Sequence, residues 1–161
     1  MNGKLRQRLG GRRVHRYLAL VFRLVVGGVF IYASMAKINY TGEFAEIIAA
    51  YQLVPFWAVN LLAVTLPWAE LICGLMMVAG VRSKAAAIAI SAMLGVFTVA
   101  IVISLLRQTP IDCGCFHNID EPMTWTTAVR DLIWLTMSAH IYLFDDAFQL
   151  ENKFLLAVRE I

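Results

Sequence analysis

Two cysteines separated by one glycine, Cys113-Gly114-Cys115, are the residues of this sequence best suited to chemistry. A disulfide between them would close a very small ring, so the bond would be strained and easily exchanged. Gly114 tolerates the unusual backbone angles that such a ring requires. Because the bond would close almost no chain, it would stabilise the fold very little. The pattern therefore favours thiol–disulfide exchange over a static structural disulfide.

The residues around this pair leave a second interpretation open. His117 would lower the pKa of a neighbouring thiol, whereas Asp112 would raise it or accept a proton. Cys113, Cys115 and His117 also form a Cys-x-Cys-x-His pattern, whose soft and borderline ligands suit copper or zinc. The spacing differs from that of common zinc motifs, and no fourth ligand is evident. A metal site therefore stays as an alternative to thiol exchange.

Charged residues inside or at the edges of long apolar runs form a second group of candidates, because a charge in a membrane is costly unless it is paired or functional. They are Arg23, Lys37, Glu70, Arg130 and Asp131. Arg23 and Glu70 fall at a similar predicted depth, so we expect an ion pair between them. Lys37 and Arg130, with Asp131 beside it, fall near the cysteine loop, where they either neutralise other charges or polarise a quinone carbonyl or a partner's thiolate. The sequence gives no role to Cys73 or His140.

Four long apolar runs must position these groups: 17–36, 56–80, 85–106 and 124–144. The chain has 161 residues, of which 60% are hydrophobic and only 16% charged, which is more apolar than a soluble domain. About 20 helical residues cross the hydrocarbon core of a bilayer, and the backbone in lipid must satisfy its own hydrogen bonds. The sequence therefore predicts an all-α integral membrane protein, with residues 1–161 forming a single four-helix transmembrane domain.

A shorter segment between the first two runs has the pattern of a surface helix. Phe44, Ile47, Ile48 and Tyr51 recur at helical spacing, and Glu43 falls on another face. This pattern predicts a short amphipathic helix that lies at the membrane interface.

The distribution of basic residues predicts the orientation of the chain. Ten of the 14 Lys and Arg residues fall in residues 1–16, in the turn between the second and third runs, and in residues 145–161. By the positive-inside rule these segments are cytoplasmic, so both termini should face the cytoplasm and the cysteine loop the periplasm of a bacterial inner membrane. There disulfides form and persist. Because the basic residues flank membrane segments, nucleic-acid binding is not indicated.

Several short motifs, in order along the chain, resemble the MauE/DoxX family of redox-associated membrane proteins, and the MauE branch most closely. They are Arg23 with Gly27-Gly28-Val29-Phe30, Ala33 and Lys37; Phe44, Tyr51 and Leu53-Val54-Pro55; Leu66-Pro67-Trp68-Ala69-Glu70-Leu71 with Gly74; and Asp112-Cys113-Gly114-Cys115-Phe116. The chain departs from the family pattern at His117, where a glycine is expected. The resemblance implies a four-helix membrane bundle, a periplasmic thioredoxin-like or substrate protein as partner and, from DoxX-type members, a link to quinone.

These observations predict a membrane component of a periplasmic thiol–disulfide system that exchanges electrons through Cys113 and Cys115. It would be a thiol–disulfide oxidoreductase component if it is an enzyme, and quinone stays open as an electron carrier with no resident cofactor assigned. Two alternatives remain. One is a non-catalytic subunit or assembly factor of a larger membrane redox complex, and the other is copper or zinc handling through Cys-x-Cys-x-His.

Overall fold

The structure, a computed structural model, describes residues 3–107 and 125–144, with side chains described from residue 14 onward except that of residue 16. These residues form five helices: α1 (Gly3–Asn39), α2 (Thr41–Ala50), α3 (Phe56–Ala79), α4 (Ser83–Leu106) and α5 (Trp125–Phe144). The described ranges contain no strand, so the predicted all-α class is confirmed.

Three of the helices are long and apolar enough to cross a membrane: Tyr17–Asn39 within α1, α3 and α4. Their outward faces carry exposed large apolar side chains, such as Val96 and Val99 on α4, as expected of a surface in contact with lipid. The protein is therefore a membrane protein. Helix α5 is not among the three, because Arg130, Asp131 and His140 lower its mean hydropathy. A four-helix transmembrane bundle requires α5 to be the fourth crossing, and this part of the expectation stays a prediction.

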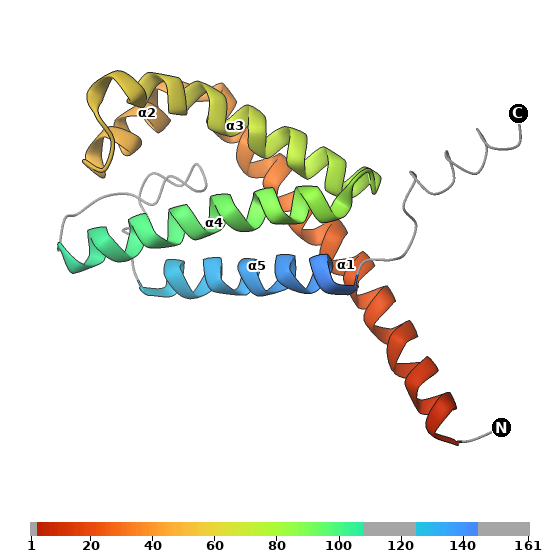
Figure 1. The fold of residues 1–161 in the computed structure, drawn as a ribbon. Coiled ribbons are helices and arrows are strands. Elements are labelled where there is room, and N and C mark those ends of the chain that lie inside the picture. The colour runs from red at the N-terminus through yellow and green to blue at the C-terminus, as the bar shows by residue number, and fades with distance from the viewer. Residues whose placement is uncertain (1–2, 108–124, 145–161) are drawn as a thin grey trace, which may run out of the picture.

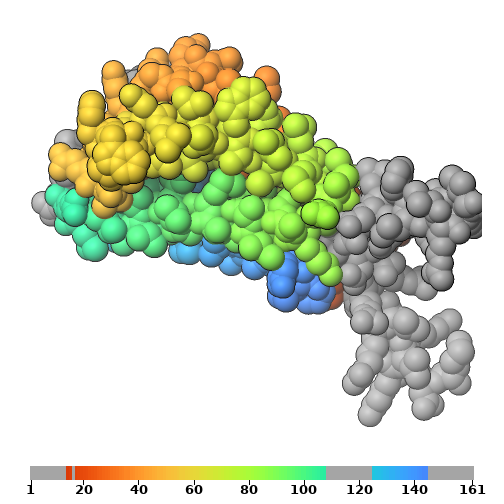
Figure 2. Space-filling view, turned by 45° about the horizontal axis from the view of Figure 1, so that its top comes forward, coloured from red at the N-terminus to blue at the C-terminus, as the bar shows by residue number. Residues whose placement is uncertain are grey.

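The helices form two pairs that pack against each other. Helix α1 packs most extensively against α3, and α4 against α5, with further contacts from α1 to α5 and from α3 to α4 (Figure 1). The short helix α2 lies beside the beginning of α3, at the end of the molecule where α4 ends and α5 begins (Figure 1). The space-filling view shows α3 and α4 lying against each other along one side of the molecule (Figure 2).

Two glycines bring α1 and α3 into close contact. A Cβ added to Gly27 would lie 3.0 Å from the carbonyl oxygen of Gly74, and a Cβ added to Gly74 would lie 3.0 Å from the carbonyl oxygen of Gly27. Small residues allow this backbone approach between membrane helices, where van der Waals packing drives association. The contact fixes the register of the two antiparallel helices, and with it the depth of every side chain on their shared face.

Polar contacts hold α5 against α4. Ser138 of α5 donates a hydrogen bond of 3.0 Å to the carbonyl oxygen of Ala87, and its hydroxyl lies 3.0 Å from that of Ser91. Ser138 and Ala87 are fully buried. In an apolar interior such bonds satisfy groups that would otherwise be costly to bury, so they favour one orientation of α5 about its axis.

Helix α2 is amphipathic, as its sequence pattern predicts. Phe44 and Ile48 are buried against Val59 and Ala63 of α3. Its charged residues lie on the opposite side, where Glu46 is exposed.

Candidate functional site

A buried ion pair between α1 and α3 is the centre of the candidate site. The ammonium group of Lys37 lies 2.7 Å and 2.9 Å from the two carboxylate oxygens of Glu70 and donates a hydrogen bond to each. Their side chains are only 8% and 5% exposed. The pair keeps both charges neutralised inside a helix assembly that is otherwise apolar.

This pairing corrects the expected ion pair between Arg23 and Glu70. Glu70 lies one helical turn before Gly74, so the register set at Gly27 places it beside the part of α1 that follows Gly27. Helical side chains lean toward the N-terminus of their own helix. In antiparallel helices Lys37 therefore leans back toward Glu70 while Glu70 leans toward Lys37. Arg23, one turn before Gly27, leans away from Glu70; it is buried in another part of the assembly.

Aromatic rings from two further helices enclose the ammonium group of Lys37. The ring centroids of Phe44 in α2 and Phe97 in α4 each lie 5.1 Å from the Lys37 nitrogen. This distance is within the range of cation–π attraction, which strengthens when the cation is removed from water. Lys37 therefore connects α1, α2, α3 and α4 at a single point.

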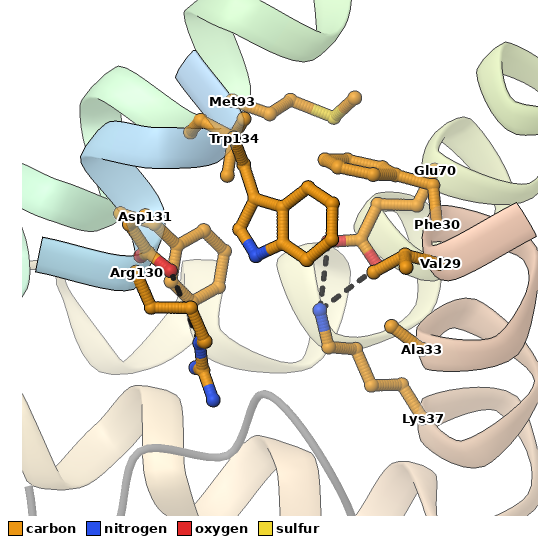
Figure 3. A pocket seen from close by; sticks show the side chains of 11 residues that line it. Val29, Phe30, Ala33, Lys37, Glu70, Met93, Arg130, Asp131 and Trp134 are labelled. Atoms are coloured by element: carbon orange, nitrogen blue, oxygen red, sulfur yellow. Dashed lines mark hydrogen bonds and ion pairs between the residues drawn. The ribbon is translucent and has the colours of Figure 1, made fainter. Parts of the chain in front are cut away.

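A second pair of charges comes from α5. The Nε atom of Arg130 lies 3.8 Å from a carboxylate oxygen of Asp131, which is within ion-pair distance but too long for a hydrogen bond. The side chain of Asp131 is 6% exposed, whereas that of Arg130 is 33% exposed. The carboxylate is thus held inside the assembly, whereas the guanidinium is partly exposed and points away from Trp134 (Figure 3).

The two charge pairs line one cavity of about 60 Å³ (Figure 3). Its remaining walls come from α1, α4 and α5 and are apolar or aromatic: Val29, Phe30, Ala33, Met93, Leu94, Phe97 and Trp134. The cavity is partly open, and a water needs roughly 10–15 Å³ of such space. It therefore has room for a few waters or for the polar edge of a larger ligand.

The cavity combines the two features that mark a ligand site in a membrane protein. Isolated charges cost several kcal/mol to bury, and a pair of apolar side chains would often be at least as stable. Ionisable groups kept in a membrane interior are for this reason taken as functional. An apolar pocket with a few convergent polar groups is also the usual form of a small-molecule site.

The structure thus brings together four of the candidate residues, Lys37, Glu70, Arg130 and Asp131. The loop residues Asp112, Cys113, Gly114, Cys115 and His117 lie outside the described residues, so the thiol site and the alternative metal site both stay predictions. Among the described residues, no group of three or more His, Cys, Asp or Glu side chains could hold a metal ion. Cys73 is a partly buried free thiol.

The sequence did not reveal all residues of the cavity. Trp134 lies in the middle of α5 rather than near its end, and follows Asp131 by three residues, so the two share a helix face. That spacing was an available signal for Trp134. Phe30 belongs to a motif that carries the family resemblance, but that motif did not indicate a cavity. Phe97 had no distinguishing signal, because aromatic residues in a membrane span usually face lipid or other helices.

His140 of α5 contacts a second histidine, which the sequence did not indicate. The Nδ1 atom of His15 in α1 lies 3.3 Å from Nε2 of His140, and Phe144 stacks on His15 with ring centroids 4.8 Å apart. This contact joins α1 to the end of α5, far from the cavity.

Comparison with known proteins gives the family of the chain. Residues 15–144 match the family model described as methylamine utilisation protein MauE. The methylamine utilization protein MauE of Paracoccus denitrificans is 31% identical over 121 residues, which cover 74% of this chain and 65% of that protein. The MauE protein of Paracoccus versutus is 32% identical, covering 72% and 63%, and that of Methylophilus methylotrophus 36% identical, covering 63% and 54%.

The matches thus span less than two thirds of the length of these relatives. No solved structure matches this chain. The family model, in contrast, covers most of the chain, including every residue of the cavity. The chain belongs to the MauE family.

Proposed function

We propose that the protein is a membrane component of a periplasmic thiol–disulfide system that serves methylamine utilisation. In this proposal Cys113 and Cys115 exchange electrons with a periplasmic partner protein, and the cavity binds the head group of a quinone. The observation that carries the proposal is the cavity itself, in which Lys37, Glu70, Arg130 and Asp131 meet inside a membrane protein. The Cys-Gly-Cys sequence supports the thiol chemistry, and the family name supports the link to methylamine utilisation.

The exchange with the partner protein balances as a dithiol–disulfide reaction. A thiolate of one protein attacks the disulfide of the other, and a mixed disulfide forms and is then resolved by the second thiol. One protein ends as a disulfide and the other as a dithiol. The reverse direction follows the same steps backward.

The link to quinone adds a second two-electron reaction. When the Cys113 and Cys115 thiols become a disulfide, two electrons and two protons leave them, and a quinone that accepts both becomes a quinol. The basic side chains of Lys37 and Arg130 would stabilise negative charge on the quinone oxygens during this transfer. Ordinary exchange with a dithiol would then regenerate the Cys113 and Cys115 thiols.

Thiol trapping in intact cells tests the proposal. We expect the Cys113→Ser and Cys115→Ser variants to lose function, and one of them to accumulate a mixed disulfide with a periplasmic protein, visible on non-reducing gels. Cys73→Ser is the matched control and should behave as the native protein, because this thiol lies within α3. Full activity of both loop variants would overturn the proposal and favour a non-catalytic subunit or assembly factor.

A further inference from the structure

The Asp131 carboxylate has no hydrogen-bond donor within the part of the chain that the structure describes. It is almost fully buried, and the one ion pair that it forms among the described residues is with Arg130, whose Nε atom lies 3.8 Å away. Glu70 differs, since both of its oxygens accept a hydrogen bond from Lys37. A buried carboxylate that accepts no hydrogen bond is unfavourable. Asp131 faces the cavity, so its missing donor can come from whatever occupies that space (Figure 3).

Trp134 supplies a hydrogen-bond donor to the same cavity. In Figure 3 the nitrogen of its indole ring lies on the side toward Asp131 and Lys37. An indole nitrogen can only donate a hydrogen bond, and this one has no acceptor among the described residues. The cavity therefore offers one acceptor, on Asp131, and one donor, on Trp134, next to each other on a single helix face.

The charges of the cavity select a neutral occupant. Lys37 and Glu70 neutralise each other, as do Arg130 and Asp131. A stably bound anion or cation, unlike charge that develops only during a reaction, would leave one uncompensated charge among mostly apolar walls. A hydroxyl group is neutral and both donates and accepts a hydrogen bond, so it fits Asp131 and Trp134 together.

We propose that Asp131 and Trp134 recognise a ring-bound hydroxyl group, so that the cavity prefers the reduced, quinol form of its ligand over the quinone. The phenolic hydroxyl of a quinol donates to Asp131 and accepts from Trp134. The oxidised ring carries only acceptors and leaves Asp131 unsatisfied. The aromatic walls of Phe30 and Phe97 suit the ring, and the partly open cavity admits its hydroxyl-bearing edge. This inference rests on the quinone link proposed above and specifies which redox form is held.

Two redox-inert probes test the preference without any electron transfer. 4-Fluorophenol has a ring hydroxyl, and 4-fluoroanisole replaces it with a methyl ether that can accept but not donate. Binding to the full chain in lipid nanodiscs is measured by fluorine NMR, with empty nanodiscs correcting for partition into lipid. A hydrogen bond to a charged group is worth enough to change affinity about tenfold. We therefore expect the phenol to bind about tenfold more tightly than the ether.

Variants assign the two hydrogen bonds to their residues. Asp131→Leu should lower phenol binding to the level of the ether and leave ether binding unchanged. Trp134→Phe keeps a ring and removes the donor, so it should weaken both probes severalfold. Glu46→Gln, at an exposed carboxylate of α2, is the control and should change neither.

Equal binding of the two probes to the native protein would overturn the inference, as would an undiminished phenol preference in Asp131→Leu. The comparison of phenol and ether binding to the native protein tests the inference even if a variant fails to fold. A Cys113→Ser/Cys115→Ser double variant separates the two proposals, because it should bind the phenol as the native protein does. Phenol selectivity without thiol exchange in cells would contradict the proposed function and leave the hydroxyl site intact.

Discussion

At the scale of single residues, the ion pair of Lys37 and Glu70 is the feature with the largest expected energetic effect. Its two short hydrogen bonds and two flanking rings satisfy each charge almost completely. Such a pair need not add stability over apolar side chains of the same size. Removing only one of the two charged side chains is costly, because the other is then buried without a partner.

This asymmetry gives a prediction for single and double variants. Lys37→Met should lower the free energy of unfolding by about 3–5 kcal/mol, because Glu70 stays buried without its partner. The double variant Lys37→Met/Glu70→Leu should regain much of that loss, since no charge is left unpaired. Glu46→Gln, at an exposed carboxylate of α2, is the control and should stay within about 0.5 kcal/mol. Unfolding followed by circular dichroism in detergent measures all three.

A double variant that is less stable than Lys37→Met would contradict the description of Lys37 and Glu70 as mutually neutralising partners. If the double variant is less stable than Lys37→Met, Glu70 has a stabilising role independent of Lys37. The Lys37 ammonium would then not be the main partner of the carboxylate.

At the scale of elements, the close contact of α1 and α3 determines which charges meet. Gly27 and Gly74 let the two backbones approach, and Glu70 is one turn away from that point. A wider separation would move Lys37 and Glu70 apart and open the cavity. The contact therefore couples helix packing to the geometry of the site.

Alanine substitutions along α1 test this coupling. A Cβ at position 27 would lie 2.7 Å from a methyl carbon of Val78 and 3.0 Å from the Gly74 carbonyl oxygen, so the helices must shift. We expect Gly27→Ala to destabilise the protein by about 1–3 kcal/mol, the usual cost of overpacking. Gly28→Ala is a matched control, because nothing lies within 4 Å of its added Cβ. It should be neutral or stabilising by up to about 1 kcal/mol, since alanine favours helix over glycine. Thermal unfolding in nanodiscs compares the two, and equal effects would contradict the close contact.

The same contact shows what the sequence could and could not predict. Apolar runs and helical spacing predicted the helices, because length and hydropathy are local properties of the chain. The candidate residues Lys37, Glu70, Arg130 and Asp131 were recognised as charges in apolar runs. Their pairing was not, since depth alone placed Arg23 near Glu70, whereas the real partner depends on the register set at Gly27. Trp134 could have been inferred from its spacing of three residues after Asp131, but only the packing of α5 against α1 and α4 shows that this face lines the cavity.

At the scale of the whole molecule, α5 decides the topology. It packs against both α4 and α1, and Ser138 is hydrogen-bonded to α4 in the interior. Its Asp131 reaches a cavity whose other walls include α1, α3 and α4, the helices that are long and apolar enough to cross a membrane. A helix in this position lies alongside the three apolar helices, so we infer that it crosses the membrane with them although its own hydropathy is lower.

A fourth crossing predicts that both ends of the chain are on the same side of the membrane. Fluorescent protein fused after residue 144 should fluoresce, because it folds in the cytoplasm, and alkaline phosphatase fused there should be inactive. Alkaline phosphatase fused after Arg107 should be active, since that position follows the third crossing and precedes the cysteine loop. The ten basic residues in the segments expected to be cytoplasmic favour this orientation.

Active phosphatase after residue 144 would mean three crossings, with α5 outside the membrane. A cytoplasmic Arg107 would place the cysteines in a reducing compartment, where a stable disulfide is rare and the proposed exchange with a periplasmic partner has no route.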